Sequence, residues 1–207
     1  MTLSGRVKQV LPHILLVGFL FVFGILLHEC GHGVAAVLFG ARIVRINVLG
    51  LDVWPQLRLD LQGGYWGRIW WQGTLTPVQR AWVGLSGNLA TTAASVVALP
   101  LLWLPGTSKK KAGTDKPRPL LLRTTLVVLG LFFLDALLHT LPTLGLPMYL
   151  FFGKRDPASV SEGYLAAQAL GCPGPAFQGI VVAYSLVAAG IITYRLILWS
   201  REAKTTT

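Results

Sequence analysis

Residues 14–32 read ILLVGFLFVFGILLHECGH, an apolar run that ends in the motif H-E-x-x-H. His28 and His32 stand four positions apart, so on a helix they share one face and both can bind the same metal ion. Glu29 follows His28 directly and can take a proton from a water that the metal activates. Ionisable residues at membrane depth are costly and are usually functional. This stretch therefore predicts a membrane-embedded helix that carries a metal site.

The composition is typical of an integral membrane protein. The chain has 207 residues, a mean hydropathy of +0.61 and 53% hydrophobic residues, against 13% charged residues. This is too apolar for an ordinary soluble domain. The net charge of +10 fits Lys and Arg side chains that flank membrane helices and face lipid headgroups, so the lipid bilayer is an expected partner. No nucleic-acid-binding motif is recognisable, and we expect no nucleic-acid partner.

Four segments are long and apolar enough to span a bilayer, which takes about 20 residues. They cover approximately residues 11–39, 81–104, 120–142 and 177–199. We expect an all-α, polytopic membrane fold in which residues 1–207 form a single membrane-embedded domain. The expected localisation is that of a multi-pass integral membrane protein, in the cell membrane. A short apolar piece at 148–152 would continue the third helix in broken or re-entrant form.

Residues 42–62, after the first helix, predict a small membrane-associated β-hairpin. Leu57, Leu59 and Leu61 alternate with polar residues, which is the periodicity of a strand. Residues 43–49 are rich in β-branched side chains and predict the other strand, with residues 50–56 as the connection.

The segment between this hairpin and the second helix is rich in Trp and Tyr, which favour the lipid–water boundary. It therefore predicts a stretch that lies along the membrane surface. Thr76-Pro77 has the pattern of an N-cap followed by a first-turn proline, which predicts that the second helix starts near residue 77, before it enters the bilayer.

A catalytic zinc site usually has three protein ligands, so a third must come from outside the motif. Asp135 is the leading choice, because a carboxylate within the apolar stretch 131–137 needs a partner. If the first and third helices run parallel, His28 and Asp135 lie at the same depth to within a helical turn. Asp156 and Glu162 are alternative carboxylates, but they lie in a polar segment where a solvated surface position is the simpler interpretation.

Two further polar residues are of interest. His139 follows Asp135 by one turn on the same face, and it is a fourth metal ligand, a partner of Asp135 or a polar residue near the helix end. Asn88 ends the Gly-rich sequence GLSGN of the second helix, where small residues allow close helix packing. Its amide is either a hydrogen-bonding group between helices or a contact for substrate.

In these features the chain resembles the site-2 protease family of intramembrane zinc metalloproteases. H-E-x-x-H, a β-rich segment, a Gly-rich helix with an asparagine and a later helix with Leu134-Asp135 follow one another in the family's order, over most of residues 20–140. The resemblance implies that His28, His32 and Asp135 bind Zn²⁺ and that Glu29 is the catalytic acid and base. It implies hydrolysis of peptide bonds in membrane-embedded or membrane-proximal segments, so the expected partner is a membrane-protein substrate.

The chain departs from the family pattern in two places. Ala136 follows Asp135 where the family often has glycine, and no Asn-Pro precedes it. A basic loop at 105–119 stands where some members carry a regulatory domain. The chain thus resembles a minimal or divergent member. The family's usual arrangement places the hairpin and metal site toward the cytosol, whereas the distribution of Lys and Arg favours the opposite orientation.

Two other functions fit the same residues. A family-like protein without peptidase activity would serve as a membrane scaffold or chaperone, with metal bound but no peptide cleaved. A transporter would use His28, Glu29 and Asp135 as an ion path, and interrupted helices near Pro142 and Pro147 fit that function. The sequence leaves the oligomeric state, the substrate and the pathway open.

Overall fold

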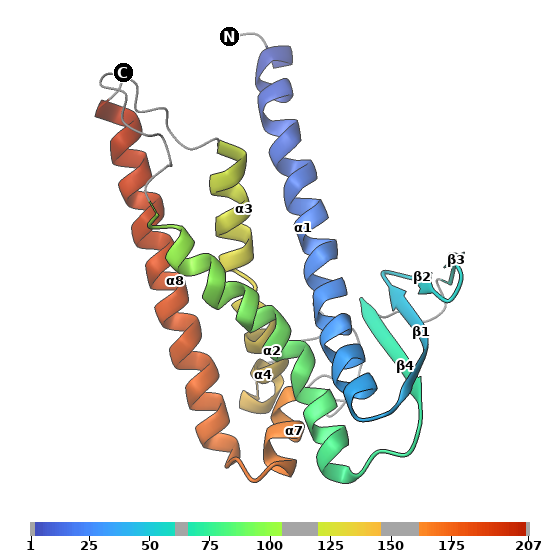
Figure 1. Cartoon of the computed structure of the whole chain (residues 1–207). Helices are drawn as coiled ribbons and strands as arrows, with labels where there is room; N and C mark the ends of the chain where they lie inside the picture. The colour runs from blue at the N-terminus through green and yellow to red at the C-terminus, as the bar shows by residue number, and fades with distance from the viewer. Residues whose placement is uncertain (1–2, 61–65, 105–119, 146–161, 206–207) are drawn as a thin grey trace.

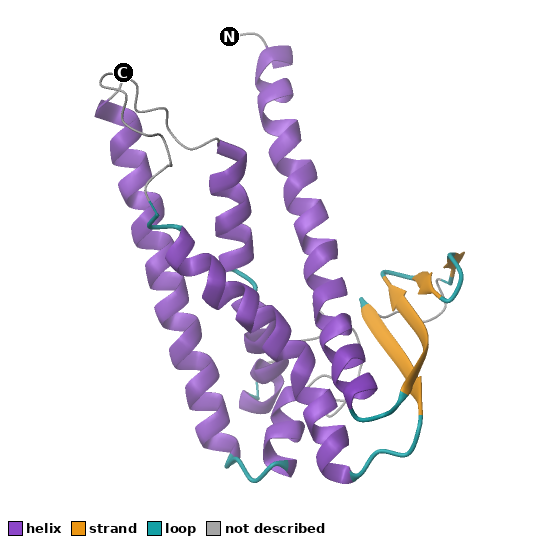
Figure 2. Ribbon diagram, in the orientation of Figure 1, coloured by secondary structure: helices purple, strands orange, loops and turns teal. Residues whose placement is uncertain are grey.

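The computed structural model describes residues 3–60, 66–104, 120–145 and 162–205 (Figures 1 and 2). The helices are α1 (Leu3–Leu38), α2 (Pro77–Leu101), α3 (Leu120–Gly130), α4 (Phe133–Thr140), the 3₁₀ helix η2 (Leu141–Leu144), α7 (Glu162–Ala169) and α8 (Gly174–Thr205). The strands are β1 (Arg42–Val48), β2 (Leu51–Trp54), β3 (Arg58–Leu59) and β4 (Gly67–Gln72).

Within the described residues, 4 helical segments are long and apolar enough to cross a membrane: Val10–Leu38, Pro77–Leu101, Leu121–Leu144 and Gly174–Arg201. This confirms the predicted set of four such helices accompanied by a small antiparallel sheet. The second helix starts at Pro77, as the N-cap pattern predicted. The Thr76 hydroxyl accepts a hydrogen bond from the Gln79 amide, and the Gln79 side chain accepts one from the Thr76 amide.

The helices alternate in direction. α1 runs the same way as α3 and α4, whereas α2 and α8 run back, so the two chain ends lie at the same end of the bundle (Figure 1). α2 crosses the bundle obliquely and contacts every other long helix. The main apolar core joins α2, α3, α4 and α8, and its buried residues are Leu99, Leu102, Leu126, Phe133, Ala188, Ile192 and Trp199.

The first helix carries large apolar side chains on its outer surface. Ile14, Leu15 and Phe19 are 61%, 64% and 66% exposed. A helix that is apolar on all sides and exposes such side chains matches a lipid environment rather than water.

The third span is broken, whereas the sequence predicted one helix over 120–142. α3 ends at Gly130, α4 begins at Phe133, and amides near the break bond three residues back, as in Leu134 N to Leu131 O at 2.9 Å. The Gly130 carbonyl accepts a hydrogen bond from the Ser95 hydroxyl of α2 at 2.6 Å. A partner from another helix thus replaces the lost helical bond, which explains why the break is tolerated.

The sheet differs from the predicted hairpin, and its strand order is β3-β2-β1-β4. β1 turns directly into β2 through Leu49 and Gly50, which have φ angles of 53° and 81°. Two successive positive φ angles make the tight turn that fits the twist of paired strands. The segment predicted as a connection, 50–56, therefore contains β2, and the strand predicted at Leu57–Leu61 shrinks to Arg58–Leu59.

The second neighbour of β1 is β4, which the sequence did not predict as a strand. The Trp-rich stretch expected along the membrane surface contributes Trp70 and Trp71 to this strand. In Figures 1 and 2 the sheet stands beside the half of α1 that carries the motif. The predictions for 148–152, for the basic loop 105–119 and for Asp156 lie outside the described residues.

Candidate metal centre

His28 and His32 point their imidazole rings at one another from consecutive turns of α1. Their Nε2 atoms lie 2.9 Å apart, and both side chains are buried. The Nδ1 atom of His28 lies 2.7 Å from Asp135 Oδ2, and that of His32 lies 2.6 Å from the Val83 carbonyl oxygen. Each ring is therefore held by its Nδ1 edge and presents its Nε2 edge to the same point.

The partners of the two rings fix their tautomers. A carboxylate and a carbonyl oxygen only accept, so Nδ1 of each neutral ring donates and Nε2 keeps its lone pair. Two lone pairs facing each other at 2.9 Å repel unless a proton or a cation lies between them. This arrangement is the one that a metal ion stabilises.

Close helix packing makes room for the two rings. A Cβ atom on Gly87 of α2 would lie 2.5 Å from His32 Nε2 and 2.7 Å from His28 Nε2. On the other side of the contact, a Cβ atom on Gly31 would lie 2.5 Å from the Ser86 carbonyl oxygen. Both glycines are therefore required by the approach of α1 to α2, and Gly87 forms a wall of the site.

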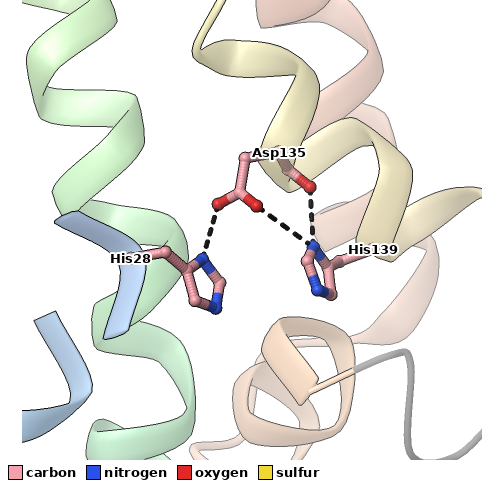
Figure 3. Close-up of side chains that lie close together, drawn as sticks. All are labelled: His28, Asp135 and His139. Atoms are coloured by element: carbon pink, nitrogen blue, oxygen red, sulfur yellow. Dashed lines mark hydrogen bonds and ion pairs between the residues drawn. The ribbon is translucent and has the colours of Figure 1, made fainter. Parts of the chain in front are cut away.

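Asp135 contacts His28, as Figure 3 shows, so the two residues lie at the same level of their helices. It enters from α4, directly after the break in the third span. Its Oδ2 atom accepts from His28 Nδ1 and, at 2.6 Å, from the Thr91 hydroxyl of α2. Asp135 thus contacts the edge of the His28 ring that faces away from His32.

His139 lies beside Asp135, in keeping with one of the three roles that the sequence allowed. Its Nδ1 donates to the Asp135 carbonyl oxygen at 2.8 Å and lies 3.4 Å from Asp135 Oδ1 (Figure 3). Its ring stacks on that of His28, with centroids 5.2 Å apart and planes at 15°. His139 therefore supports both residues from the side of α4.

Glu162 reaches the histidine pair from α7. Its Oε2 atom lies 3.2 Å from His32 Nε2, although the side chain keeps 46% of its surface exposed. The sequence favoured a solvated position for this residue; it is exposed, as expected, and its carboxylate also points at the motif.

Glu29 is buried between α1 and the sheet. A Cβ atom on Gly67, the first residue of β4, would collide with Glu29 Oε1 and would lie 2.8 Å from Glu29 Cγ. The backbone of an outer strand of the sheet therefore passes directly over this carboxylate.

Asn88 is buried at the contact of α2 with α7. A Cβ atom on Gly163 would collide with Asn88 Nδ2, so the two helices meet here with backbone against side chain. Its Oδ1 atom is buried and has no hydrogen-bond partner within the described part of the chain. Asn88 thus packs against α7, and its role as an interhelical hydrogen-bonding group or a substrate contact stays a prediction.

Two groups of side chains within the described residues could hold a metal ion: His28 with His32 and Glu162, and His28 with Asp135 and His139. Ligand atoms about 2.0–2.1 Å from a tetrahedral zinc ion lie about 3.3–3.4 Å from one another. In the first group the separations of 2.9 Å and 3.2 Å come close to this value. Imidazole nitrogen and carboxylate oxygen are a donor set that suits Zn²⁺.

Comparison of the chain with models of protein families, with curated proteins and with solved structures finds no match. The function must therefore be inferred from the geometry and chemistry of the site.

Three residues at the site were not predicted from the sequence: Thr91, Gly67, and Gly87 in its place as a wall of the site. Thr91 could have been found, because it lies one turn after Asn88 on the same face of an apolar helix. Gly67 carried no signal, since its role depends on how the sheet packs against α1.

Proposed function

We propose that this chain is an intramembrane, zinc-dependent metalloendopeptidase of the kind that the site-2 protease resemblance implies. The observation that carries the proposal is the convergence of the two Nε2 lone pairs at 2.9 Å, with each Nδ1 atom held by a separate partner. His28 and His32 would hold the ion, together with a carboxylate. Glu29 belongs to the same helical turn.

The chemistry is hydrolysis of a peptide bond. Zinc bound at this site would supply a Lewis acid that lowers the pKa of a water and polarises the scissile carbonyl. Glu29 takes a proton as the water oxygen attacks the carbonyl carbon, and it returns that proton to the amide nitrogen as the C–N bond breaks. One water is consumed, and the products are a carboxylic acid and an amine.

The residues around Glu29 and the histidines prepare this step. Burial of Glu29 beneath Gly67 keeps bulk water away from the carboxylate, which strengthens electrostatic interactions there. Asp135 holds His28 in the tautomer that offers Nε2, and the Val83 carbonyl does the same for His32. The rings therefore need little reorganisation to bind a cation.

The position of β4 supports an extended peptide segment as the substrate. Among the described strands β4 pairs only with β1, so no described strand pairs with its other edge, and it begins over Glu29. An extended segment of a membrane protein can add to this edge by backbone hydrogen bonds, and an unwound segment is also easier to attack than a helix. Strand addition on β4 would bring the scissile bond toward Glu29.

Strand addition is tested with the substrate rather than with the protease. In an added antiparallel or parallel strand, every second amide faces β4. We expect prolines placed one by one along a substrate segment to inhibit cleavage at alternate positions. Uniform tolerance of proline on both sides of the scissile bond would exclude this binding mode.

The proposed activity is tested with purified protein in liposomes that contain a membrane-embedded model substrate. We expect Glu29→Gln to lower kcat/KM by about 10²–10⁴-fold, the usual contribution of a general base, while zinc content stays unchanged. The matched control is Cys30→Ala, the next residue of the motif, whose side chain is exposed. It should keep both activity and zinc.

Three results would contradict the proposal. A parent protein without bound metal would exclude the metal site. Stoichiometric zinc without cleavage of any membrane peptide would favour the scaffold or chaperone. Ion flux into liposomes that is lost in Glu29→Gln would favour the transporter.

A further inference from the structure

The two carboxylates near the histidines approach opposite edges of the rings. Asp135 contacts Nδ1 of His28, whereas Nε2 of the same ring faces His32. These nitrogens lie on different edges of an imidazole, so a metal between the two Nε2 atoms would be screened from Asp135 by the His28 ring. The donor group that includes Asp135 also leaves out His32, and it would therefore split the H-E-x-x-H pair.

Glu162 approaches the Nε2 edge of the His32 ring, the edge that faces His28. Its Oε2 lies 3.2 Å from His32 Nε2, and one atom each from Glu162, His28 and His32 together form a group that could hold one ion. Three atoms with lone pairs, two nitrogens and one oxygen, thus lie within 4.8 Å of one another. Three protein ligands leave one position of a tetrahedral site open, as catalytic zinc sites do.

The position of Glu162 is fixed by the packing of α7 on α2. The Gly163 backbone rests on Asn88, and a Cβ atom on Gly84 would lie 3.5 Å from Ala166 Cβ. Small residues on both helices therefore allow close contact over one face of α7. This contact brings the first residue of α7 over the histidine pair.

From this geometry we infer that Glu162 is the third ligand of the metal centre, together with His28 Nε2 and His32 Nε2, and that Asp135 is a positioning residue that holds His28. This inference rests on the proposed function, since it concerns the same ion. It replaces the ligand set that the resemblance implies, in which Asp135 binds the metal.

Asp135 has a defined task in this arrangement. A carboxylate that accepts from the second nitrogen of a ligand histidine fixes the ring and makes the ligand more basic. The Thr91 hydroxyl donates to the same oxygen of Asp135, so the carboxylate is itself oriented from α2. Loss of such a partner lowers metal affinity, typically by about 10–100-fold, without removing the site.

The test compares zinc content and affinity of full-length protein in detergent after dialysis against a chelator. We expect Glu162→Gln to lose bound zinc, and Glu162→His to regain it, because a third imidazole is an effective zinc ligand. Asp135→Asn should keep the ion with a dissociation constant raised about 10–100-fold. Gln168→Ala, an exposed change on the same helix, is the matched control and should behave as the parent.

A spectroscopic measurement separates ligation from folding. Cobalt(II) in place of zinc reports its donor atoms through its visible absorption. We expect Glu162→His to bind cobalt with a changed spectrum, since nitrogen replaces oxygen, whereas Gln168→Ala keeps the spectrum of the parent. Recovery of binding in Glu162→His would show that Glu162→Gln lost a ligand rather than the fold.

The inference is overturned if Glu162→Gln keeps full zinc and an unchanged cobalt spectrum, and Asp135→Asn then losing the ion would assign Asp135 as the ligand. It is also overturned if Glu162→His fails to bind metal while Asp135→His binds it. A parent protein that binds no metal would contradict the proposed function as well, whereas the other two results would leave the proposed function intact.

Discussion

The two ends of the helical bundle are held together by different kinds of contact. At the candidate metal centre, α1 meets α2 through glycines, with Gly31 on the Ser86 carbonyl and Gly87 on both imidazoles. At the end that holds the chain termini, large apolar side chains form the core, and the Arg195 guanidinium lies 5.1 Å from the Trp199 ring centroid.

This difference bears on how tightly each end fixes its residues. Backbone atoms and ring nitrogens cannot move aside, so contacts through glycine determine the relative position of two helices almost completely. The ends of Leu and Ile side chains can change rotamer, so an apolar contact accommodates small changes in volume at modest cost. The protein places His28, His32 and Asp135 at the end with the least freedom.

The largest difference between the two ends should appear when one methyl group is added at each of them. Gly87→Ala places a carbon against the nitrogens of His28 and His32, and we expect loss of bound zinc and of cleavage. Gly130→Ala meets the flexible end of Ile192 at 3.2 Å, and we expect zinc content to remain. Zinc content and monodispersity of the two variants check this. Retention of zinc in Gly87→Ala would show that the close approach of α1 to α2 is not required.

A smaller effect on zinc binding is expected from the hydrogen bond of Thr91 to Asp135, which reaches the ion only through His28. Thr91→Val keeps the shape of the side chain and removes the hydroxyl that donates to Asp135. We expect the zinc dissociation constant to rise about tenfold, the lower end of the range for such partners. Competition with a chromogenic chelator measures it, and Thr92→Val is the neighbouring control. An unchanged dissociation constant would contradict the role assigned to Asp135.

Beyond the site, one hydroxyl of α2 joins α3 and α8. Ser95 donates to Gly130 O at 2.6 Å and accepts from the Tyr184 hydroxyl at 3.0 Å. We expect Ser95→Ala to lower the free energy of unfolding by about 1 kcal/mol, within the range for hydrogen bonds between membrane helices. Unfolding in mixed detergent measures this, with Ser200→Ala as control because Ser200 bonds within its own helix. Zinc content should not change.

The smallest effect should lie in the sheet, where charges are paired. Hydrogen bonds from Arg45 and Asn47 hold the pKa of Asp52 below its ordinary value. Its contribution to stability is therefore complete above the ordinary aspartate pKa of about 3.9 and is lost as the pH falls through the lower, folded-state pKa. Protection factors of β1 and β2 amides, which correct the exchange rates for their intrinsic pH dependence, should fall in acid, and Asp52→Asn should weaken this fall. Protection factors that stay constant in acid in the parent would contradict the assignment.

The sequence predicted what lies within single helices better than what lies between them. Spacing along α1 placed His28 and Glu29 in one helical turn and His32 in the next. The cost of burying a lone carboxylate pointed to Asp135 as their partner. The edge of the His28 ring that Asp135 contacts could not be predicted, because it depends on the rotation of α4 after the break at Gly130. That break depends in turn on a hydroxyl from α2.

Glu162 and β4 illustrate the same limit. A glutamate in a polar segment resembles any solvated residue, and only the contact of Gly163 with Asn88 brings it to His32. The Trp-rich stretch was predicted only to lie along the membrane surface, and pairing with β1 makes residues 67–72 a strand. In both cases a contact between distant segments decided the local structure.

The break in the third span also affects how the protein would respond to bilayers of different thickness. Membrane helices adapt to a thinner or thicker hydrocarbon layer mainly by tilting, at a cost of about a fraction of a kcal/mol per Å. α3 can tilt about the break while Ser95 holds Gly130 and Thr91 holds Asp135. A change in the tilt of α3 therefore does not move or rotate Asp135. The geometry around His28 should thus be the same in membranes of different lipid composition.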